Sequence, residues 1–225
     1  TAWITVAAGN EGQVLSFSGG VPTWTTTIGL NDVQNPTTGE IWMDRNLGAS
    51  QVATSSTDAA AYGDLYQWGR AADGHELRTS SITSTNATTA VPNGGNSWDG
   101  LFITEGNPPY DWLSPQDDNL WQGVSGTNNP CPSGYRLPTE AEWEAELTSW
   151  GSNNSAGAFA SPLKLPVAGY RNGSNGSFSA VDFWGFYWSM TVSGALSQRL
   201  YFDSGNAYMG NSTRATGISV RCLKD

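Results

Sequence analysis

Basic side chains are scarce in this sequence. Its 225 residues include 20 acidic and 10 basic side chains, which gives a formal net charge of −10 at pH 7. The lysines are Lys164 and Lys224 alone, and no basic run exists that would follow a phosphate backbone. We therefore expect no nucleic-acid partner.

Long apolar runs are absent as well. A helix that crosses a bilayer needs about 20 consecutive apolar residues, and no segment approaches that length, so we expect no membrane insertion. No signal-peptide pattern opens the chain. The first residue is Thr1 rather than methionine, which we interpret as the start of a fragment or of a processed product. The missing signal then excludes no compartment.

Histidine and cysteine are rarer still. His75 is the single histidine, and its neighbours Asp73 and Glu76 favour a solvated loop position over a role as ligand or general base. Cys131 and Cys222 lie far apart and form no metal-binding pair. Two alternatives stay open for them: a disulfide that ties the end of the chain to its centre, or two buried free thiols.

Several catalytic and metal-binding motifs are missing. The chain has no G-x-S-x-G nucleophile elbow, and G-G-N-S-W-D-G lacks the lysine and helix of a phosphate loop. Asp99, Asp117, Asp118 and Asn119 offer hard oxygen ligands, but they match no EF-hand spacing. We expect no enzyme, no cofactor and no metal site, with structural calcium as the remaining alternative.

Tryptophan, by contrast, is abundant. The chain has 11 tryptophans and 27 glycines, and only 13% of its residues are charged. Aromatic residues this frequent supply a core, and the length suits one substantial domain with or without an appendage. We predict an α+β fold with short strands, one or two helices and long irregular loops.

The clearest predicted helix follows the segment N-P-C-P-S-G-Y-R-L-P. Thr139 and Glu142 form a capping-box pattern at its start, and acidic residues crowd the first turns, where the helix dipole favours them. Gly151 is expected to end it. An apolar stripe runs along the helix, and the residues expected to be buried are Leu137, Trp143 and Leu147.

The remaining segments are predicted more coarsely. Residues 1–28 alternate β-prone runs with Gly-rich turns, which indicates a hairpin-like attachment segment before a ligand-binding domain at 29–225. A turn at Asn35–Gly39 precedes a strand, and a short helix starts near Thr57 or Asp58. Tryptophans are expected to pin the loop 71–130, and Arg70 to pack on an aromatic ring. Residues 162–225 are predicted as strands, with core residues Trp188, Val192, Leu200, Phe202, Val220 and Cys222.

Six segments together resemble a known superfamily. They are G-Y-R-L-P-T-E-A-E-W-E around Thr139, I-W-M-D-R-N-L-G, Y-G-D-L-Y-Q-W-G-R, V-A-G-Y-R, F-Y-W-S and the terminal S-V-R-C-L-K-D. They resemble the formylglycine-generating-enzyme-like branch of the C-type lectin fold. The chain order is similar to major-paralogous-domain proteins of bacterial surfaces and to variable proteins of diversity-generating retroelements. The resemblance spans roughly Ile41 to Asp225 and implies a C-type lectin fold.

The residues that support two known activities of this fold are missing from the sequence. The oxidases that share the signature use two cysteines close together in the C-terminal half, and Cys222 has no such neighbour. The calcium-dependent lectins carry E-P-N or Q-P-D together with W-N-D, and this chain has neither. A carbohydrate stacked on exposed aromatic rings remains open as a ligand.

The segment 176–218 sets large aromatic residues among small polar ones, which is the composition of antibody paratopes. In the retroelement variable proteins, this C-terminal portion is diversified at template adenines, mainly in asparagine-type codons. Such codons yield Phe, Tyr, Asp, Gly, Ser, Thr, Ile or Asn but neither Met nor Trp, so Trp184 requires a different codon. The predicted ligand-binding residues are Phe183, Trp184, Phe186, Tyr201, Asp203, Tyr208, Gly210, Asn211, Ser212, Thr216 and Ile218.

The resemblance implies a non-catalytic, receptor-recognition protein that displays a diversified surface outside the cell, on a cell surface or on a virion. Its expected partner is a cell-surface protein or glycan, and no oligomeric state is predicted. The alternatives are an undiversified surface-adhesion or scaffold domain and an oxidase-like enzyme. Strand alternation is expected to place the side chains of Phe186, Tyr201, Asp203 and Tyr208 outward. We therefore expect their joint replacement to leave the fold intact.

Overall fold

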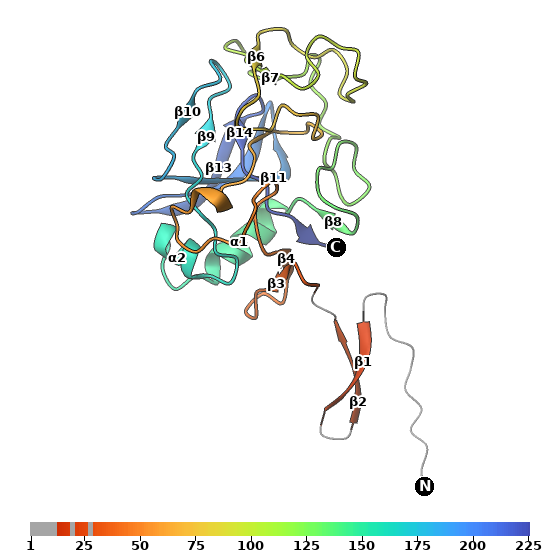
Figure 1. Cartoon of the computed structure of the whole chain (residues 1–225), viewed down its shortest axis with the longest axis vertical. Helices are drawn as coiled ribbons and strands as arrows, with labels where there is room; N and C mark the ends of the chain where they lie inside the picture. The colour runs from red at the N-terminus through yellow and green to blue at the C-terminus, as the bar shows by residue number, and fades with distance from the viewer. Residues whose placement is uncertain (1–12, 19–20, 27–28) are drawn as a thin grey trace.

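The computed structural model of the chain describes residues 13–18, 21–26 and 29–225. Short strands, two α-helices and long loops make up these ranges, so the fold class is α+β, as predicted (Figure 1). The helices are α1 (Glu140–Thr148) and α2 (Ser155–Ala160), and a 3-10 turn, η1, spans Ala59–Ala61. In the described ranges, no helix combines the length and apolar character that a bilayer span requires.

The described strands assemble into five small sheets. A three-stranded antiparallel sheet has the order β11 (Gly185–Ser193), β12 (Leu196–Phe202), β13 (Ala207–Thr213). A four-stranded sheet has the order β10 (Phe178–Ser179), β9 (Tyr170–Arg171), β14 (Gly217–Ile218), β5 (Tyr66–Gln67). Another has the order β3 (Asp32–Gln34), β4 (Ile41–Met43), β15 (Leu223–Lys224), β8 (Tyr135–Arg136). Two strand pairs complete the set: β1 (Gln13–Ser18) with β2 (Val21–Thr26), and β6 (Ile82–Thr83) with β7 (Phe102–Ile103).

The β1–β2 pair lies in the segment predicted as an attachment hairpin. Gln13 stands opposite Thr26 in an antiparallel register that continues to Ser18 and Val21. Residues 1–12, 19–20 and 27–28 of that segment lie outside the described residues. The role of this segment in attachment stays a prediction.

Helix α1 begins where the capping box predicts. The N–H of Glu142 donates to Oγ1 of Thr139 at 3.2 Å, and the N–H of Thr139 donates to the Glu142 carboxylate at 2.7 Å. Trp143 is fully buried, 4.8 Å from the ring of Trp42, and its indole N–H donates to the carbonyl of Trp188 at 3.0 Å. The predicted burial of Trp143 is therefore confirmed, and this side chain ties α1 to β11.

Two features of α1 correct the sequence prediction. The helix ends at its cap Ser149, before Gly151, because the Ser149 N–H bonds back into the last turn. Leu147 is only half-buried, whereas Glu146 is fully buried. The Glu146 side chain accepts a hydrogen bond of 2.5 Å from the amide of Asn35, and a buried polar group is tolerated when it is hydrogen-bonded in this way.

Other local predictions are confirmed. The N–H of Gly39, whose φ of 82° suits glycine, closes a turn onto the Asn35 carbonyl at 2.8 Å ahead of β4. Asp58 caps η1 by accepting from the Ala60 N–H at 3.2 Å. Leu137 and the predicted core residues Trp188, Leu200, Phe202, Val220 and Cys222 are buried, and Val192 is half-buried.

Tryptophans pin the long loop 71–130, as expected. The Trp112 indole N–H donates to the carbonyl of Trp68 at 2.7 Å, and the ring of Trp121 lies 5.8 Å from that of Trp68. The guanidinium of Arg70 lies 5.3 Å from the Trp112 ring centroid, which confirms its packing on an aromatic.

The prediction of a strand from Pro162 to Arg171 is mostly wrong. Only β9 at the end of this run is a strand, and Lys164 has a φ of 51°, which interrupts any extended backbone. Leu163 and Leu165 are still fully buried, so the run serves the core without joining a sheet.

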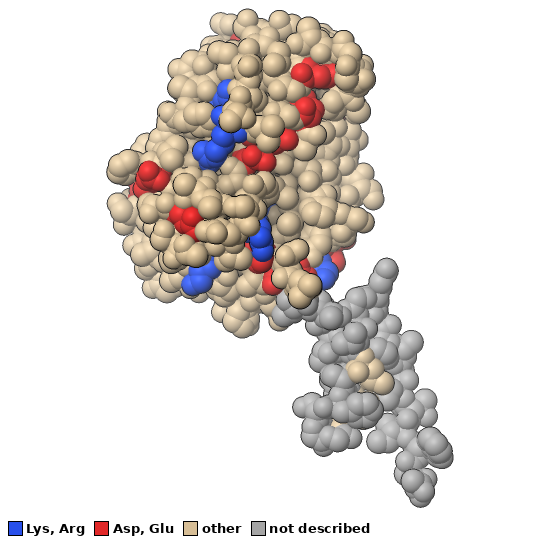
Figure 2. All heavy atoms as spheres, viewed as in Figure 1, with Lys and Arg blue, Asp and Glu red and all other residues tan. Residues whose placement is uncertain are grey.

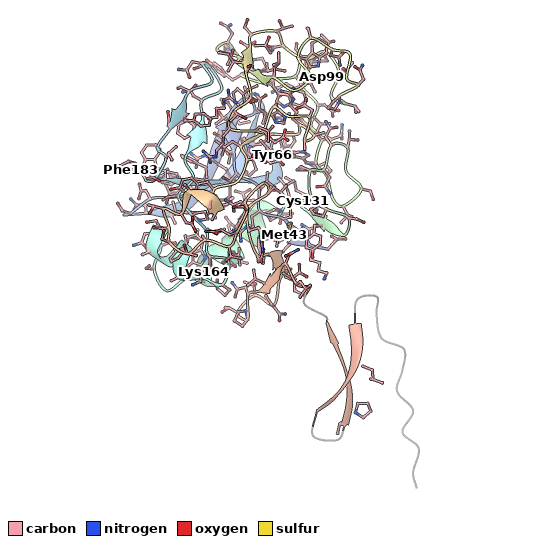
Figure 3. All side chains as sticks on the ribbon, viewed as in Figure 1. Met43, Tyr66, Asp99, Cys131, Lys164 and Phe183 are labelled. Atoms are coloured by element: carbon pink, nitrogen blue, oxygen red, sulfur yellow. A yellow bond between two sulfur atoms is a disulfide. The ribbon has the colours of Figure 1, made fainter. Side chains whose placement is uncertain are left out.

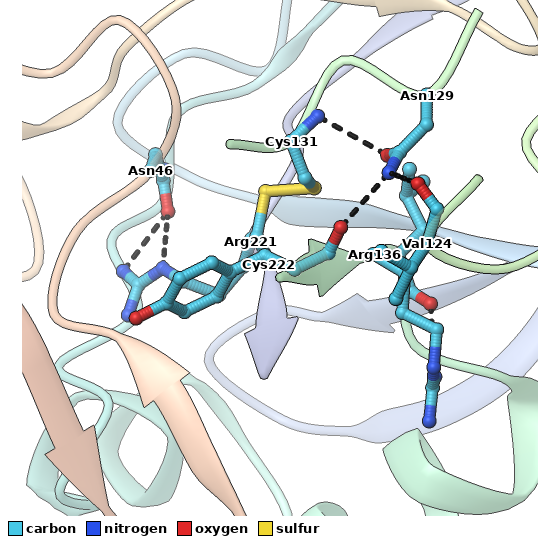
Figure 4. The surroundings of a disulfide bond; sticks show 9 residues. Asn46, Val124, Asn129, Cys131, Arg136, Arg221 and Cys222 are labelled. Atoms are coloured by element: carbon cyan, nitrogen blue, oxygen red, sulfur yellow. Dashed lines mark hydrogen bonds between the residues drawn. A yellow bond between two sulfur atoms is a disulfide. The ribbon is translucent and has the colours of Figure 1, made fainter. Parts of the chain in front are cut away.

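A disulfide joins Cys131 to Cys222, with Cα atoms 5.9 Å apart, so the bridged alternative is the observed one (Figure 4). Asn129 holds the turn around Cys131: its side-chain oxygen accepts from the Cys131 N–H at 3.1 Å. Beside Cys222, the guanidinium of Arg221 is fully buried and donates to Asn46 at 3.0 Å and to the carbonyl of Leu163 at 2.7 Å. Burial lowers the pKa of Arg221 to about 10. The chain end is thus fastened by a covalent bond and by an internal arginine.

Candidate ligand-binding face

The sheet β11–β12–β13 is covered on one side and partly open on the other. On the covered side, Tyr187, Leu200 and Phe202 pack against Trp143 and its neighbours in one hydrophobic cluster. The other side, here named the aromatic face, carries residues from two cross-strand rows. One row is Phe186, Tyr201 and Tyr208, and the next is Trp188, Arg199 and Gly210.

A cavity of about 240 Å³ lies between the aromatic face and the neighbouring sheet that contains β9 and β14. It is here named the Arg199 cavity, after the one charged residue in its lining. Three rings, one guanidinium, two hydroxyl side chains and one aliphatic side chain line it: Tyr170, Trp184, Phe186, Arg199, Ser212, Thr216 and Ile218. Gly210 stands opposite Arg199 on the edge strand and adds no side chain above the guanidinium.

The Arg199 guanidinium is held by aromatic rings. It lies 4.6 Å from the ring centroid of Phe186 and 5.3 Å from that of Tyr201. Its Nε and Nη1 atoms are buried and have no hydrogen-bond partner among the described residues. Burial lowers the pKa of Arg199, and the phenol groups of Tyr208 and Tyr201 oppose that shift. The cavity therefore has a positive charge in its wall that forms no salt bridge with a carboxylate of the described residues.

A second hollow, here named the outer depression, adjoins the Arg199 cavity. It has a volume of about 410 Å³ and shares Tyr170 and Trp184 with the cavity, so these two rings form a common wall. Its other lining residues are Ser179, Ala180 and Phe183. The turn that carries it includes Ala180 and Asp182 at φ values of 54° and 71°, and the Tyr62 hydroxyl donates to the Asp182 carboxylate. Phe183 lies at the margin of the molecule in Figure 3.

The predicted ligand-binding residues divide into exposed and buried groups. Phe183, Trp184 and Tyr208 have 72%, 39% and 48% of their surface exposed. Phe186 and Tyr201 have only 6% and 8% exposed, which corrects the expectation that their rings point into solvent. The cause is ring-on-ring packing, since the two centroids are 5.2 Å apart and Tyr170 covers Phe186 at 5.1 Å. Thr216 is buried and Ile218 is fully buried. Both contribute to the proposed binding surface only by lining the Arg199 cavity.

Two other predicted residues do not face a ligand. Asn211 is exposed but alternates with Tyr208 and Ser212 along β13, so it lies on the opposite side of the strand. The Asp203 carboxylate is used in hydrogen bonds within its own turn. It accepts from the Tyr201 hydroxyl at 2.5 Å and from the N–H of Gly205 at 2.7 Å. The Tyr201 hydrogen bond lowers the pKa of Asp203.

Arg199 and Tyr170 were missed by the sequence reasoning. Arg199 stands two residues before Tyr201 in β12, so strand periodicity was a signal that the two share a face. Tyr170 gave no such signal because it comes from β9, in a different sheet.

The prediction of a solvated position for the single histidine is wrong. His75 is fully buried rather than solvated, and both of its ring nitrogens are engaged. Nδ1 bonds to Asp73 at 2.6 Å, and Nε2 accepts from the N–H of Gln67 at 3.2 Å. Burial lowers the pKa of His75 to about 4. Although burial alone would raise it, hydrogen bonds from His75 hold the pKa of Asp73 well below its usual value.

Asp73, His75 and Glu76 are also the one group of three metal-ligand side chains found among the described residues. Asp73 is already paired with Arg70 at 2.7 Å, and neither nitrogen of His75 is free. This group is therefore a satisfied internal network. The candidates for calcium do not gather: Asp99 accepts from the N–H of Gly94 at 2.9 Å, and Asp118 pairs with Arg214 at 2.5 Å.

A groove of about 570 Å³ runs elsewhere, along α1. Threonine, serine, alanine and glutamate side chains line it, with Glu142 and Glu144 among them, and its lining contains no aromatic ring. Figure 2 shows that charged groups lie scattered among uncharged ones on the face in view. Both hollows of the aromatic face are instead walled by large rings, and the Arg199 cavity adds a half-buried guanidinium.

Comparison of the chain with protein-family models, with curated proteins and with solved structures finds no match.

Proposed function

We propose that this chain is a non-catalytic, receptor-recognition protein with a C-type lectin fold that binds its ligand on the aromatic face. The observation that carries the proposal is the difference between the two sides of one sheet. One side of β11–β12–β13 is packed against α1 and its core, while the other carries the exposed ring of Tyr208 and borders two hollows that the exposed Phe183 and Trp184 help to wall. A rigid support below a surface of aromatic and small polar residues is the arrangement of paratopes.

Three further features support the proposal. The sequence resembles the retroelement variable proteins, whose diversified residues fall in this same C-terminal portion. The exposed side chains Phe183 and Tyr208 belong to the predicted variable set, although Phe186, Tyr201 and Ile218 of the same set are buried. The disulfide is typical of proteins outside the cytosol, which agrees with display on a cell surface or a virion. Because it uses both cysteines of the chain, no thiolate is free for oxidase chemistry.

The binding test compares the face with a matched surface position. A bivalent fusion of the chain is applied to intact bacterial cells and to a glycan array, alongside a Phe183→Ser/Tyr208→Ser variant. The control is Leu30→Ser, which removes a fully exposed apolar side chain just before β3, a strand of a different sheet. We expect binding that the face variant loses and the control keeps. Equal binding by all three proteins would refute the proposal.

The encoding DNA tests diversification separately. A near-repeat of the 3′ end that differs only at adenines, beside a reverse transcriptase gene, is the expected result. If the repeat is missing while the face still binds, the chain is an undiversified adhesion domain.

A further inference from the structure

We propose that the Arg199 cavity binds the carboxylate of an aspartate or glutamate side chain in a protein partner, and that the outer depression takes an adjacent apolar side chain. This inference rests on the proposed function, because it names the chemistry that the aromatic face recognises.

The first argument is the unsatisfied guanidinium. Nε and Nη1 of Arg199 are buried without an acceptor in the described part of the chain. The more deeply buried arginines differ, since each donates several hydrogen bonds to carboxylates, hydroxyls, amides or main-chain carbonyls: Arg70, Arg171, Arg214 and Arg221. Arg199 as a whole is half-buried and lines the cavity, so an anion that enters the cavity meets a guanidinium that pairs with no carboxylate of the described residues. Arg199 is therefore placed as a binding residue whose position is held by its contacts with the Phe186 and Tyr201 rings.

The second argument selects the anion. Arg199 is the only charged residue in the cavity lining, so the site matches a single negative charge. A carboxylate carries one charge and accepts two parallel N–H bonds from a guanidinium. A phosphate monoester carries nearly two charges at pH 7, and the lining offers it no second cation. The hydroxyl of Ser212 supplies a further donor in the same cavity, whereas that of Thr216 is already hydrogen-bonded to Thr213 at 2.8 Å.

The third argument selects a polypeptide over an acidic sugar. A sugar ring presents hydroxyls on most of its edges, and each needs a partner when it is buried. The outer depression is lined by three aromatic side chains and one alanine, with Ser179 as its one serine: Tyr170, Phe183, Trp184, Ala180 and Ser179. An acidic side chain followed by an apolar one matches this pattern of one cation beside apolar walls. The common wall of Tyr170 and Trp184 then separates the two side chains.

The test uses the full chain and two pairs of small probes. Blocked Glu-Leu and Gln-Leu dipeptides have the same shape, but Glu carries a carboxylate where Gln carries an uncharged amide. Glucuronate likewise carries a carboxylate where glucose carries an uncharged hydroxymethyl group. Binding is followed by NMR through the indole N–H signal of Trp184, assigned with a Trp184→Phe variant. We expect the Glu-Leu probe to shift this signal with saturation and the Gln-Leu probe to bind at least about thirtyfold more weakly, as loss of one partner of a buried charge pair implies.

Two variants separate the cavity from general charge effects. Arg199→Gln should lose Glu-Leu binding, whereas Arg45→Gln, which removes the same charge from a surface pair with Asp44, should keep it. Loss of the Arg199 contacts with the Phe186 and Tyr201 rings should lower the melting temperature of Arg199→Gln modestly without unfolding the protein. If that variant does not fold, the comparison of Glu-Leu with Gln-Leu on the unmodified protein still decides.

Each outcome has one meaning. Equal binding of Glu-Leu and Gln-Leu, or no binding of either, overturns the carboxylate assignment. Tighter binding of glucuronate than of Glu-Leu overturns the polypeptide assignment. The proposed function survives both results if cells still distinguish the Phe183→Ser/Tyr208→Ser variant from the parent, and it fails only if that distinction is lost.

Discussion

Replacing Phe186 by alanine should destabilise the protein strongly although this residue belongs to the aromatic face. The ring has 6% of its surface exposed and lies 5.2 Å from Tyr201, 5.1 Å from Tyr170 and 4.6 Å from the Arg199 guanidinium. Truncation of a buried phenylalanine costs about 3–5 kcal/mol. Aromatic pairs of this geometry contribute about 0.5–1.5 kcal/mol each beyond their buried area, which places Phe186→Ala in the upper part of that range.

The matched control is Phe183→Ala, because Phe183 is a phenylalanine three residues away with 72% of its surface exposed. Its free energy of unfolding should stay within about 0.5 kcal/mol of the parent. Urea unfolding followed by near-ultraviolet circular dichroism measures both variants. For a chain of this size, about 2–4 °C per kcal/mol converts the Phe186→Ala loss into a fall of about 6–20 °C in melting temperature.

The same reasoning corrects the expectation for the joint replacement of Phe186, Tyr201, Asp203 and Tyr208. Because two of these rings are buried and Asp203 holds a turn, the fourfold variant should be strongly destabilised. If Phe186→Ala instead unfolds like the parent, its ring does not pack as the structure has it. The walls of the Arg199 cavity would then be wrongly placed.

Three further predictions concern the framework. Trp143→Ala should cost about 3–5 kcal/mol in urea unfolding because the ring is fully buried; Trp143→Phe should cost less, and a change within about 0.5 kcal/mol for the alanine variant would show that the helix face is misplaced. Joint replacement of Cys131 and Cys222 by alanine should cost about 4–5 kcal/mol on the loop-entropy account, since the bridge spans 91 positions; equal unfolding curves would contradict this. The pKa of His75 is lowered to about 4, so its single imidazole NMR signal should not titrate between pH 8 and pH 5. The unfolded chain takes up this proton near pH 6.5, so the contribution of His75 to stability should be lost as the pH falls from 6.5 through 4; a midpoint near 6.5 in the folded protein would refute its burial.

Features that depend on neighbours in the sequence were predictable from it. The capping box at Thr139 and Glu142 needs only residues three positions apart, and the turn at Asn35–Gly39 needs only five. Burial of Trp143 followed from its place on the apolar stripe of that helix. The helix end was less predictable, because Ser149 bonds back into the last turn before Gly151 is reached.

The candidate site was predictable only in part. Residues Phe183, Trp184 and Tyr208 are exposed as expected, because they occupy a turn and an edge strand that nothing else in the described chain covers. Asn211 was assigned to the face on composition, but alternation along β13 puts it on the other side. Sequence composition cannot tell the two sides of a strand apart unless the register is known.

The sequence by itself determined the α+β class, the start of α1 and the supply of aromatic residues, because periodicity, caps and composition are local properties. Tertiary structure alone decided that Phe186 and Ile218 are buried, that His75 is internal and that Cys131 meets Cys222. It also decided that the guanidinium of Arg199 lies on the Phe186 and Tyr201 rings, with no acceptor among the described residues for its Nε and Nη1 atoms. Each of these depends on contacts between segments distant in the chain, where a second sheet or loop covers a side chain that its own strand leaves open.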